Sequence, residues 1–478
     1  MINLRTYQQK LISDIRAKMS NGSKRNVLQL ATGGGKTVIF SFMVKQASDR
    51  GLKCLILTDR IELLEQAGGT FQKLGIVYEN ITAGTNRIPV SRVMVAMVET
   101  IKRRVKKRLD FAVLLKSINL LIIDECHKQS FDEVFQYISE DCYVIGATAT
   151  PYRTNAKKPM SDYFTGLVTG PSISKLIESC YLANPEYYGV NIDLSSVRMK
   201  AGEFDENDMT KLYGERKVFE GLKHNLELHA KGLKTMIFCP SVASSLNVAS
   251  ELGCLHVDGT MSAAARDNVL KTFENTPGAV LTNCGITTTG YDCPSIECIV
   301  LYRATTSLPL YLQMIGRGSR VTDTKHTFKI LDFGMNVERF DFWHVDRIWS
   351  LEAQKKKSRK KDSFPVKFCP KCGAILAVNT KSCQYCGFIW PVIEKEKVFA
   401  ELQKLDYREV QRRMVTASVE EMEALRTAKG YKVGYLLHKF DKYEQFEQYE
   451  KLKGYRRGWA KINAERFGVK KDANIYNI

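Results

Sequence analysis

The chain has 478 residues, which at about 100–200 residues per domain allows two to four domains and excludes a single small binding module. Its composition, 44% hydrophobic and 26% charged, is typical of a globular protein, and no run approaches the roughly 18 apolar residues of a membrane-spanning helix, so no membrane association is expected. Lys and Arg outnumber Asp and Glu by 71 to 52, and this net charge of +19 favours a polyanionic partner such as nucleic acid.

Short apolar runs recur along the first 350 residues, with helix-length polar segments between them. This pattern is typical of buried parallel strands joined by crossover helices, and its two series predict two α/β lobes. Residues 154–174 are rich in Lys, Pro, Gly and Ser and predict a loop, whereas the charged residues 201–220 predict a surface helix. The runs are 27–30, 54–57, 93–96, 120–123 and 143–146 in the first series, and 236–238, 279–281, 298–301 and 328–331 in the second.

A glycine-rich turn, Ala-Thr-Gly-Gly-Gly-Lys-Thr, lies between the first predicted strand and a helix-compatible stretch. Its glycines, Gly33, Gly34 and Gly35, allow backbone N–H groups to point at phosphate oxygens at the amino end of that helix. Lys36 can reach the β- and γ-phosphates, and the Thr37 hydroxyl can bind Mg²⁺. The position of the turn favours a nucleotide-binding loop over a purely structural one.

Two adjacent carboxylates, Asp124 and Glu125, come directly after the predicted strand 120–123. The carboxyl ends of parallel strands are where open sheets bind ligands. Asp124 is suited to hold Mg²⁺ through water, and Glu125 is suited to polarise the water that attacks the γ-phosphorus. An Asp-Glu pair on a surface is usually inert, but one that ends a buried strand after a phosphate loop indicates nucleotide hydrolysis.

The phosphate loop and the Asp-Glu-Cys-His segment together resemble motifs of superfamily 2 helicases of the DEAD/DEAH type. Other motifs of that superfamily follow in the family's order: residues 147–151 resemble motif III, 288–292 resemble motif V and 313–320 resemble motif VI. The resemblance implies two tandem RecA-like lobes that bind ATP and Mg²⁺ between them.

The same resemblance assigns roles to the matched residues. Arg5 and Gln8, in the upstream segment Leu-Arg-Thr-Tyr-Gln-Gln, are expected to contact the nucleotide, with Gln8 at the adenine base. Gly290 and Asp292 are also expected to contact the nucleotide, and His127, Thr148 and Thr150 are expected to couple the nucleotide state to the nucleic-acid track.

Motif VI carries two arginines, Arg317 and Arg320, which are three residues apart. On a helix such a pair lies on one face, so both side chains can point across a cleft at a triphosphate. The planar guanidinium group suits charge stabilisation on a transferring phosphoryl group. An Arg pair on a helix is usually solvated, but the Gln-x-x-Gly-Arg-x-x-Arg context favours a catalytic role for both arginines and for Gln313. ATP is therefore expected to close the cleft and hydrolysis to release it.

Loops that follow strands in both lobes are expected, by the same resemblance, to hold nucleic-acid phosphates without reading bases. Residues 102–108 carry six cations in seven positions, and a solvated helix face and a duplex contact remain equally open for them. The expected track contacts are Arg60, Thr82, Gly84 and Thr100 in the first lobe, and Ser241, Thr260 and Thr288 in the second.

Four cysteines form two Cys-x-x-Cys knuckles that are separated by ten residues: Cys369 with Cys372, and Cys383 with Cys386. Four thiolates at this spacing suit a tetrahedral, structural Zn²⁺ site with no open position for catalysis. Disulfide bonds are the alternative. They are disfavoured because the scattered remaining cysteines and the absence of an apolar leader indicate a reducing, cytoplasmic setting.

The last part of the chain, residues 393–478, is basic and rich in Lys, Glu and Tyr, which predicts a mainly helical region. Two similar segments, 429–435 and 453–459, combine Gly, aromatic residues and cations. They fit base stacking with phosphate binding about as well as they fit two helix caps with aromatic side chains turned inward. The expected order is lobe 1 at 1–165, lobe 2 at 166–350, a basic linker at 351–365, a zinc ribbon at 366–392 and the tail at 393–478.

Over about residues 1–392 the motifs look like those of RadD-like bacterial helicases and, more distantly, phage helicases of the UvsW kind. This resemblance implies an ATP-dependent DNA helicase or translocase that remodels duplex or branched DNA, with branch migration, in repair, recombination or replication. DNA binding is expected to be largely sequence-independent, in the cytoplasm of a bacterium or a phage-infected cell. An ATP-dependent RNA helicase, and a duplex translocase that separates no strands, remain open. A non-enzymatic nucleic-acid adaptor is disfavoured because each catalytic position holds a competent residue.

Overall fold

The computed structural model describes residues 3–59, 69–85, 87–153, 158–189, 192–286, 291–352, 366–368, 375–377, 403–405, 418–420, 422–423, 436–437, 440, 442–456, 458–466 and 469. It divides into two units, Met1–Lys404 and Leu405–Ile478. Among the described residues, no helix combines the length and the apolar character that crossing a membrane requires.

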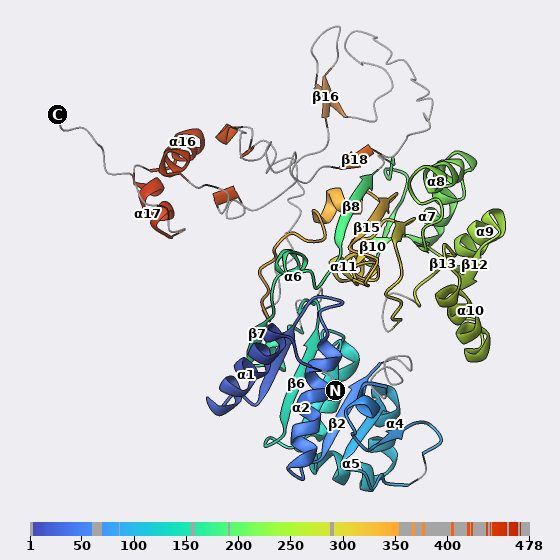
Figure 1. Ribbon diagram of the computed structural model, residues 1–478. Helices are drawn as coiled ribbons and strands as arrows, with labels where there is room; N and C mark the ends of the chain where they lie inside the picture. The colour runs from blue at the N-terminus through green and yellow to red at the C-terminus, as the bar shows by residue number, and fades with distance from the viewer. Residues whose placement is uncertain are drawn as a thin grey trace. The chain divides into compact units, whose positions relative to one another are not determined.

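The first lobe of unit 1 is a seven-stranded sheet with the order β3-β4-β2-β5-β6-β1-β7 (Figure 1). All its recorded strand pairs are parallel, so crossover connections rather than tight hairpins join successive strands. The strands are β1 (Arg25–Gln29), β2 (Cys54–Thr58), β3 (Tyr78–Ile81), β4 (Val93–Met97), β5 (Leu120–Asp124), β6 (Tyr143–Thr148) and β7 (Gly166–Thr169). The helices are α1 (Thr6–Ser20), α2 (Lys36–Asp49), α4 (Val98–Lys107), α5 (Leu109–Lys116), η1 (Gln129–Tyr137) and η2 (Met160–Asp162).

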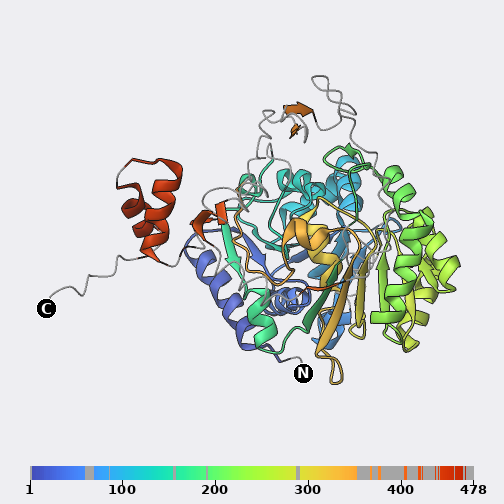
Figure 2. The same cartoon turned by 90° about the horizontal axis from the view of Figure 1, so that it is seen from above.

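The second lobe is another seven-stranded sheet, with the order β12-β13-β11-β14-β15-β8-β18. Figure 2 shows its green helices, which include α8, gathered at one flank of the lobe. The strands are β8 (Asn184–Gly189), β11 (Thr235–Phe238), β12 (Leu255–Val257), β13 (Val280–Asn283), β14 (Cys298–Leu301), β15 (Thr327–Asp332) and β18 (Gln403–Leu405). The helices are α6 (Ile173–Glu178), α7 (Glu206–Tyr213), α8 (Arg216–His229), α9 (Val242–Leu252), α10 (Ala263–Asn275), α11 (Leu308–Gly316) and α12 (Asn336–Phe340). Two small hairpins pair β9 (Met199–Lys200) with β10 (Glu203–Phe204), and β16 (Val366–Phe368) with β17 (Ile375–Ala377).

Each lobe has its own apolar core, built where strands and helices meet. In the first lobe β2 and β5 are buried along their whole length, so their residues read as continuous apolar runs rather than alternating ones. A separate cluster, which includes Met209, Tyr213 and Tyr302, fills the second lobe. The predicted α/β class with two parallel-sheet lobes is confirmed.

Two local predictions were wrong in part. The predicted loop at 154–174 contains the strand β7 and the start of α6, because an edge strand needs no strongly apolar run to pair with β1. The predicted surface helix at 201–220 begins as a β-hairpin and then buries Met209 and Tyr213 on α7. The strands β3 and β8 were also not expected, since each is a largely polar segment.

Unit 2 holds α16 (Tyr443–Lys453) and α17 (Trp459–Arg466), which pack on each other. The aromatic rings of Tyr455 and Trp459 lie 4.7 Å apart, and Trp459 also lies 5.8 Å from the buried Tyr449. Gly454 ends α16 in the left-handed conformation. The second of the two similar segments is therefore a helix cap with packed aromatics, and the first lies outside the described residues.

Candidate active site

The glycine-rich turn connects β1 to the amino end of α2. Gly33 and Gly35 have φ angles of +83° and +85°, in the region that favours glycine. A side chain on Gly34 would place its Cβ 2.7 Å from the Leu30 Cγ. The first turn of α2 thus presents backbone N–H groups without side chains in front of them, the arrangement that binds phosphate. Lys36 begins the helix, and its Nζ donates a 3.3 Å hydrogen bond to the Leu30 carbonyl.

The first turn of α1 contacts the glycine-rich turn. The Gln8 side chain is buried, accepts a 2.9 Å hydrogen bond from the Arg5 backbone N–H, and donates to the Gly34 carbonyl at 3.4 Å. The Tyr7 hydroxyl donates to the same carbonyl at 2.7 Å. The Arg5 guanidinium lies 4.4 Å from the ring centre of Tyr181, and the Tyr7 ring lies 5.3 Å from it. Tyr181 was not predicted, since nothing near it in the sequence marks it as part of the site.

Asp124 and Glu125 are both buried at the carboxyl end of β5. Glu125 adopts a left-handed backbone conformation, with φ of +49°, and its N–H donates to Asp124 Oδ1 at 3.0 Å. Burial, reinforced by the Glu125 charge, raises the pKa of Asp124. Burial alone would also raise the pKa of Glu125, but its hydrogen bond with His127 and the charge of Lys36 lower that pKa overall. A divalent cation fits this donor set, because it would favour the ionised form of both carboxylates.

Two of the three predicted coupling residues, His127 and Thr148, contact Glu125, and the third, Thr150, contacts Thr148. The Thr148 hydroxyl lies 3.2 Å from Glu125 Oε2 and 2.8 Å from His127 Nδ1, and it accepts a 3.0 Å hydrogen bond from the Thr150 N–H. A hydroxyl has one hydrogen, so if Thr148 donates it to Glu125 then His127 must carry its proton on Nδ1. The two segments come together because β5 and β6 are neighbouring strands, with Asp124 paired to Ala147.

Motif VI differs from its prediction. The helix α11 ends at Gly316, so Arg317 and Arg320 lie in the turn that follows and not on one helical face. The Ser319 hydroxyl donates to the Gly316 carbonyl at 2.9 Å and closes the helix end. A side chain on Gly318 would place its Cβ 2.5 Å from the Phe328 ring, so the turn is packed tightly against β15.

The two arginines are held by motif V. Arg317 is buried and donates to the Tyr291 carbonyl. Arg320 forms a 2.6 Å ion pair with Asp292 and donates to the Arg317 carbonyl at 3.5 Å. The predicted catalytic residue Gln313 is buried on α11, one turn earlier. The structure therefore brings Asp292 and both arginines together.

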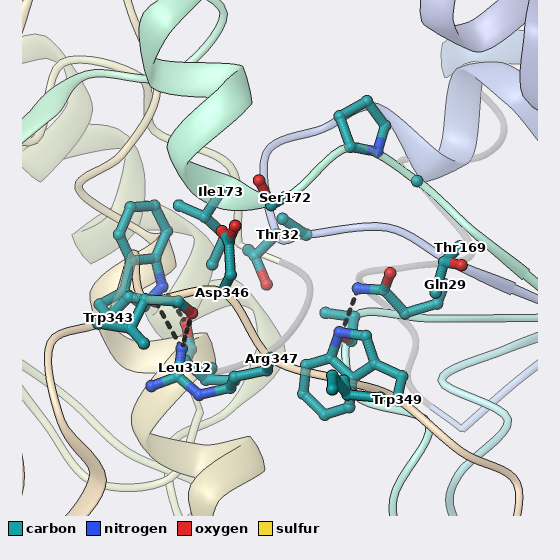
Figure 3. A pocket seen from close by; sticks show the side chains of 16 residues that line it. Gln29, Thr32, Thr169, Ser172, Ile173, Leu312, Trp343, Asp346, Arg347 and Trp349 are labelled. Carbon is teal, nitrogen blue, oxygen red and sulfur yellow. Dashed lines mark hydrogen bonds between the residues drawn. The ribbon is translucent and has the colours of Figure 1, made fainter. Parts of the chain in front are cut away.

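The phosphate loop lies against the motif VI turn. A Cβ added to Gly316 would lie 2.6 Å from the Thr32 Cβ, and one added to Gly33 would lie 3.3 Å from Ser319 Oγ and 3.8 Å from Arg320 Cγ. A cavity of about 250 Å³ adjoins Thr32 of this contact. Figure 3 shows its lining, which includes Gln29, Thr32 and Thr169 of the first lobe, Ser172 at the start of α6, and Leu312, Trp343, Arg347 and Trp349 of the second lobe.

Three of the predicted track contacts in the first lobe, Thr82, Gly84 and Thr100, lie near α4. The backbone N–H of Thr82 donates to Thr85 Oγ1 at 2.9 Å, and the Thr82 carbonyl accepts a 2.7 Å hydrogen bond from Arg104. Gly84 lies in the same turn, and Thr100 lies in the first turn of α4. Arg104 therefore orders the loop that was expected to hold phosphates.

In the second lobe, the predicted contacts follow β11 and β12. Ser241 begins α9 by accepting a 3.1 Å hydrogen bond from the Ser244 N–H, and Thr260 donates to Asp258 at 2.7 Å. Both hydroxyls thus have partners within the lobe. The predicted residues Arg60, Thr288, Gly290, Cys369, Cys372, Cys383 and Cys386 lie outside the described residues.

Three of the six cations in the basic run at 102–108 form ion pairs within their own lobe. Lys102 and Lys106 both pair with Glu133, at 3.8 and 2.5 Å, and Arg108 pairs with Asp110 at 2.5 Å. Arg104 is occupied by loop carbonyls. These contacts favour the interpretation of a solvated, internally paired helix face.

Comparison with known families and proteins agrees with this architecture. Residues 1–153 match the family model described as "Type III restriction enzyme, res subunit", and residues 217–322 match "Helicase conserved C-terminal domain". The helicase-named protein IRC3 of Saccharomyces cerevisiae is 33% identical over 69% of this chain and 51% of its own length. A "51.5 kDa protein" of a Lactococcus phage is 27% identical over 82% of this chain and 84% of its own length.

Restriction enzymes are similar as well. The type I restriction enzyme EcoAI endonuclease subunit of Escherichia coli is 27% identical over 70% of this chain and 46% of its own length, so the chain spans about half of this relative and of IRC3. A solved fragment of an HsdR subunit from Vibrio vulnificus covers 72% of this chain and 68% of its own, with a TM-score of 0.56 at 24% identity, and shows the same fold. The helicase models and helicase-named relatives confirm the prediction of an ATP-dependent helicase or translocase.

Proposed function

We propose that this superfamily 2 helicase or translocase hydrolyses ATP between its two lobes and uses the cycle to move along DNA, remodelling duplex or branched DNA. The observation that carries the proposal is the contact of Gly316 with Thr32, which sets the arginine turn of one lobe against the phosphate loop of the other. Because the site needs residues of both lobes, binding and hydrolysis of the nucleotide can change the position of one lobe relative to the other.

The chain's own residues supply the steps of hydrolysis. Lys36 and the N–H groups at the start of α2 would bind the β- and γ-phosphates. Thr37 and Asp124 would hold Mg²⁺, which neutralises phosphate charge when bound. Glu125 would orient the attacking water and accept its proton.

The other lobe would complete the site. Arg317 and Arg320 would stabilise the charge that develops on the γ-phosphoryl group, and Arg320 would leave Asp292 to do so. Thr148 and His127 fix Glu125 by the hydrogen bonds described above, so a shift of β6 would alter the water-activating group. Nucleic-acid binding that shifts β6 would therefore change the rate of ATP hydrolysis.

DNA is preferred over RNA as the track because of the restriction-enzyme similarity in the first lobe and along most of the core. The RNA-bound Dbp5 structure of S. cerevisiae, at 16% identity and a TM-score of 0.51, shares only the fold. ATP turnover would be measured with single-stranded DNA, duplex, fork, four-way junction and RNA, with Glu125→Gln as the inactive control. Stimulation by forks or junctions would support branch migration in repair, recombination or replication, and stimulation by RNA alone would overturn the DNA proposal.

A structural zinc ribbon is proposed for residues 366–392. Cys369 and Cys372 lie in the connection between β16 and β17, which pair in antiparallel fashion from Val366 with Ala377 to Phe368 with Ile375. A knuckle in the turn of a hairpin is a common way to present two thiolates to Zn²⁺. Metal analysis of the purified chain tests this proposal.

A further inference from the structure

Arg153 lies two residues beyond motif III and has no role in the account above. Its side chain is only 3% exposed, and its guanidinium group forms a two-pronged ion pair with Asp132 of η1, with nitrogen–oxygen distances of 2.7 and 3.2 Å. Two parallel hydrogen bonds of this kind strengthen a buried ion pair and fix the orientation of the guanidinium group.

The guanidinium group also donates to backbone carbonyls. Nε lies 2.9 Å from the His127 oxygen, Nη2 lies 3.4 Å from the oxygens of both Cys126 and Lys128, and Nη1 lies 3.3 Å from that of Lys158. Cys126, His127 and Lys128 are the three residues that directly follow Glu125. One cation therefore gathers three successive carbonyls of the loop that carries the water-activating carboxylate.

This loop needs such support because Glu125 is in the left-handed backbone region, where non-glycine residues are strained. The N–H groups of the loop donate to other carbonyls, from Cys126 to Ala147 at 3.2 Å and from Lys128 to Glu125 at 3.1 Å. Two of its side chains have contacts of their own, His127 with the Thr148 hydroxyl at 2.8 Å and Lys128 with Asp59. The peptide planes after Glu125 also depend on what the carbonyls contact. In the described part of the chain, their side-chain partner is Arg153.

We propose that Arg153 is a positioning residue for ATP hydrolysis, and that it acts by fixing the 126–128 backbone so that Glu125 and His127 face the γ-phosphate. The inference rests on the proposed function. Asp132 acts only through Arg153, as the acceptor that orients its guanidinium group. Lysine cannot replace the arginine, because an ammonium group cannot reach the carboxylate and three carbonyls in one plane.

The test measures steady-state ATP hydrolysis of the full chain at saturating DNA, together with urea unfolding, for Arg153→Lys and Arg153→Met. We expect kcat to fall about 10- to 100-fold, as for a small displacement of a catalytic group, while the KM for ATP stays within about twofold because the phosphate loop is untouched. Asp132→Leu combined with Arg153→Met should lose no more activity than Arg153→Met alone. If Arg153→Met does not fold, Arg153→Lys keeps the charge and most of the volume and still decides the question.

Arg339→Lys is the matched control. Arg339 is a partly buried arginine of the second lobe that donates to the carbonyls of Thr305 and Gly334 at 3.1 and 3.4 Å. Its substitution should lower stability and leave kcat unchanged. The inference would be overturned if Arg153→Lys kept the wild-type kcat, including the case in which the variant lowered only the stability to urea. An inactive wild-type chain would overturn the proposed function and this inference together, whereas an active wild type with active Arg153 variants would overturn only the latter.

Discussion

Lys128 forms an ion pair with Asp59, which joins the loop after β5 to the loop after β2. In the sequence, Lys128 directly follows the Asp-Glu-Cys-His segment, and Asp59 directly precedes the predicted track contact Arg60. Their side chains are 26% and 19% exposed, so the pair is partly shielded from solvent. This link runs between the hydrolytic carboxylates and a segment expected to bind nucleic acid.

Breaking this pair should weaken the stimulation of ATP hydrolysis by DNA more than it weakens basal hydrolysis. We expect Lys128→Met to lower the stimulation about three- to tenfold, which corresponds to a coupling of about 1 kcal/mol. The measurement is the ratio of kcat with and without DNA. The charge-reversed double variant, Asp59→Lys with Lys128→Asp, should restore part of the ratio, and equal loss in the double variant would show that the pair does not couple the two loops.

Removing a single catalytic group should abolish hydrolysis without unfolding the lobes. Lys36→Ala, Glu125→Gln and Arg320→Ala are each expected to lower DNA-stimulated kcat by about 100-fold or more, since each removes a group that acts on the transition state. Circular dichroism and urea unfolding would check the fold. Full activity in one of the variants would remove the role assigned to that residue.

The lobe contact at Gly316 gives a steric test. Gly316→Ala places a methyl group 2.6 Å from the Thr32 Cβ, so the arginine turn must move away from the phosphate loop. We expect kcat to fall about tenfold. Thr32→Gly in the same chain removes the clash and should recover most of the rate. No recovery in this double variant would mean that the contact does not form in the active state.

The metal content of the purified chain tests whether residues 366–392 form a zinc ribbon. Four thiolate ligands should retain about one zinc ion per chain through purification, and Cys372→Ser together with Cys386→Ser should lose it. Elemental analysis provides the count. A chain purified without chelators that carries no zinc, and whose four cysteines react freely with a thiol reagent, would contradict the prediction.

Features set by short stretches of sequence could be predicted. Gly33 to Thr37 form a recognisable turn between strand and helix, and Asp124 ends a run of four apolar residues, so both the strand and its carboxyl end are visible in the sequence. The parallel sheets followed from the same apolar runs. These signals depend on neighbours along the chain.

Features set by contacts between distant segments could not be predicted from the sequence. Arg153 meets the 126–128 carbonyls across 25 to 27 positions, and Lys128 meets Asp59 across 69 positions, so no local pattern marks either. Motif VI was read as one helical face because spacing alone cannot show that α11 ends at Gly316. Tyr181 was missed for a similar reason, since its contact with Arg5 depends on how the linking segment folds back.

We propose that ATP hydrolysis between the lobes drives movement along DNA. The most direct measurement is displacement of a triplex-forming strand from duplex DNA, with wild type and Glu125→Gln compared in the presence of ATP. We expect displacement by the wild type only, with a delay that grows with the length of duplex between the entry site and the triplex. ATP hydrolysis that is stimulated by DNA but displaces nothing at any length, with strands of a fork also left paired, would contradict it.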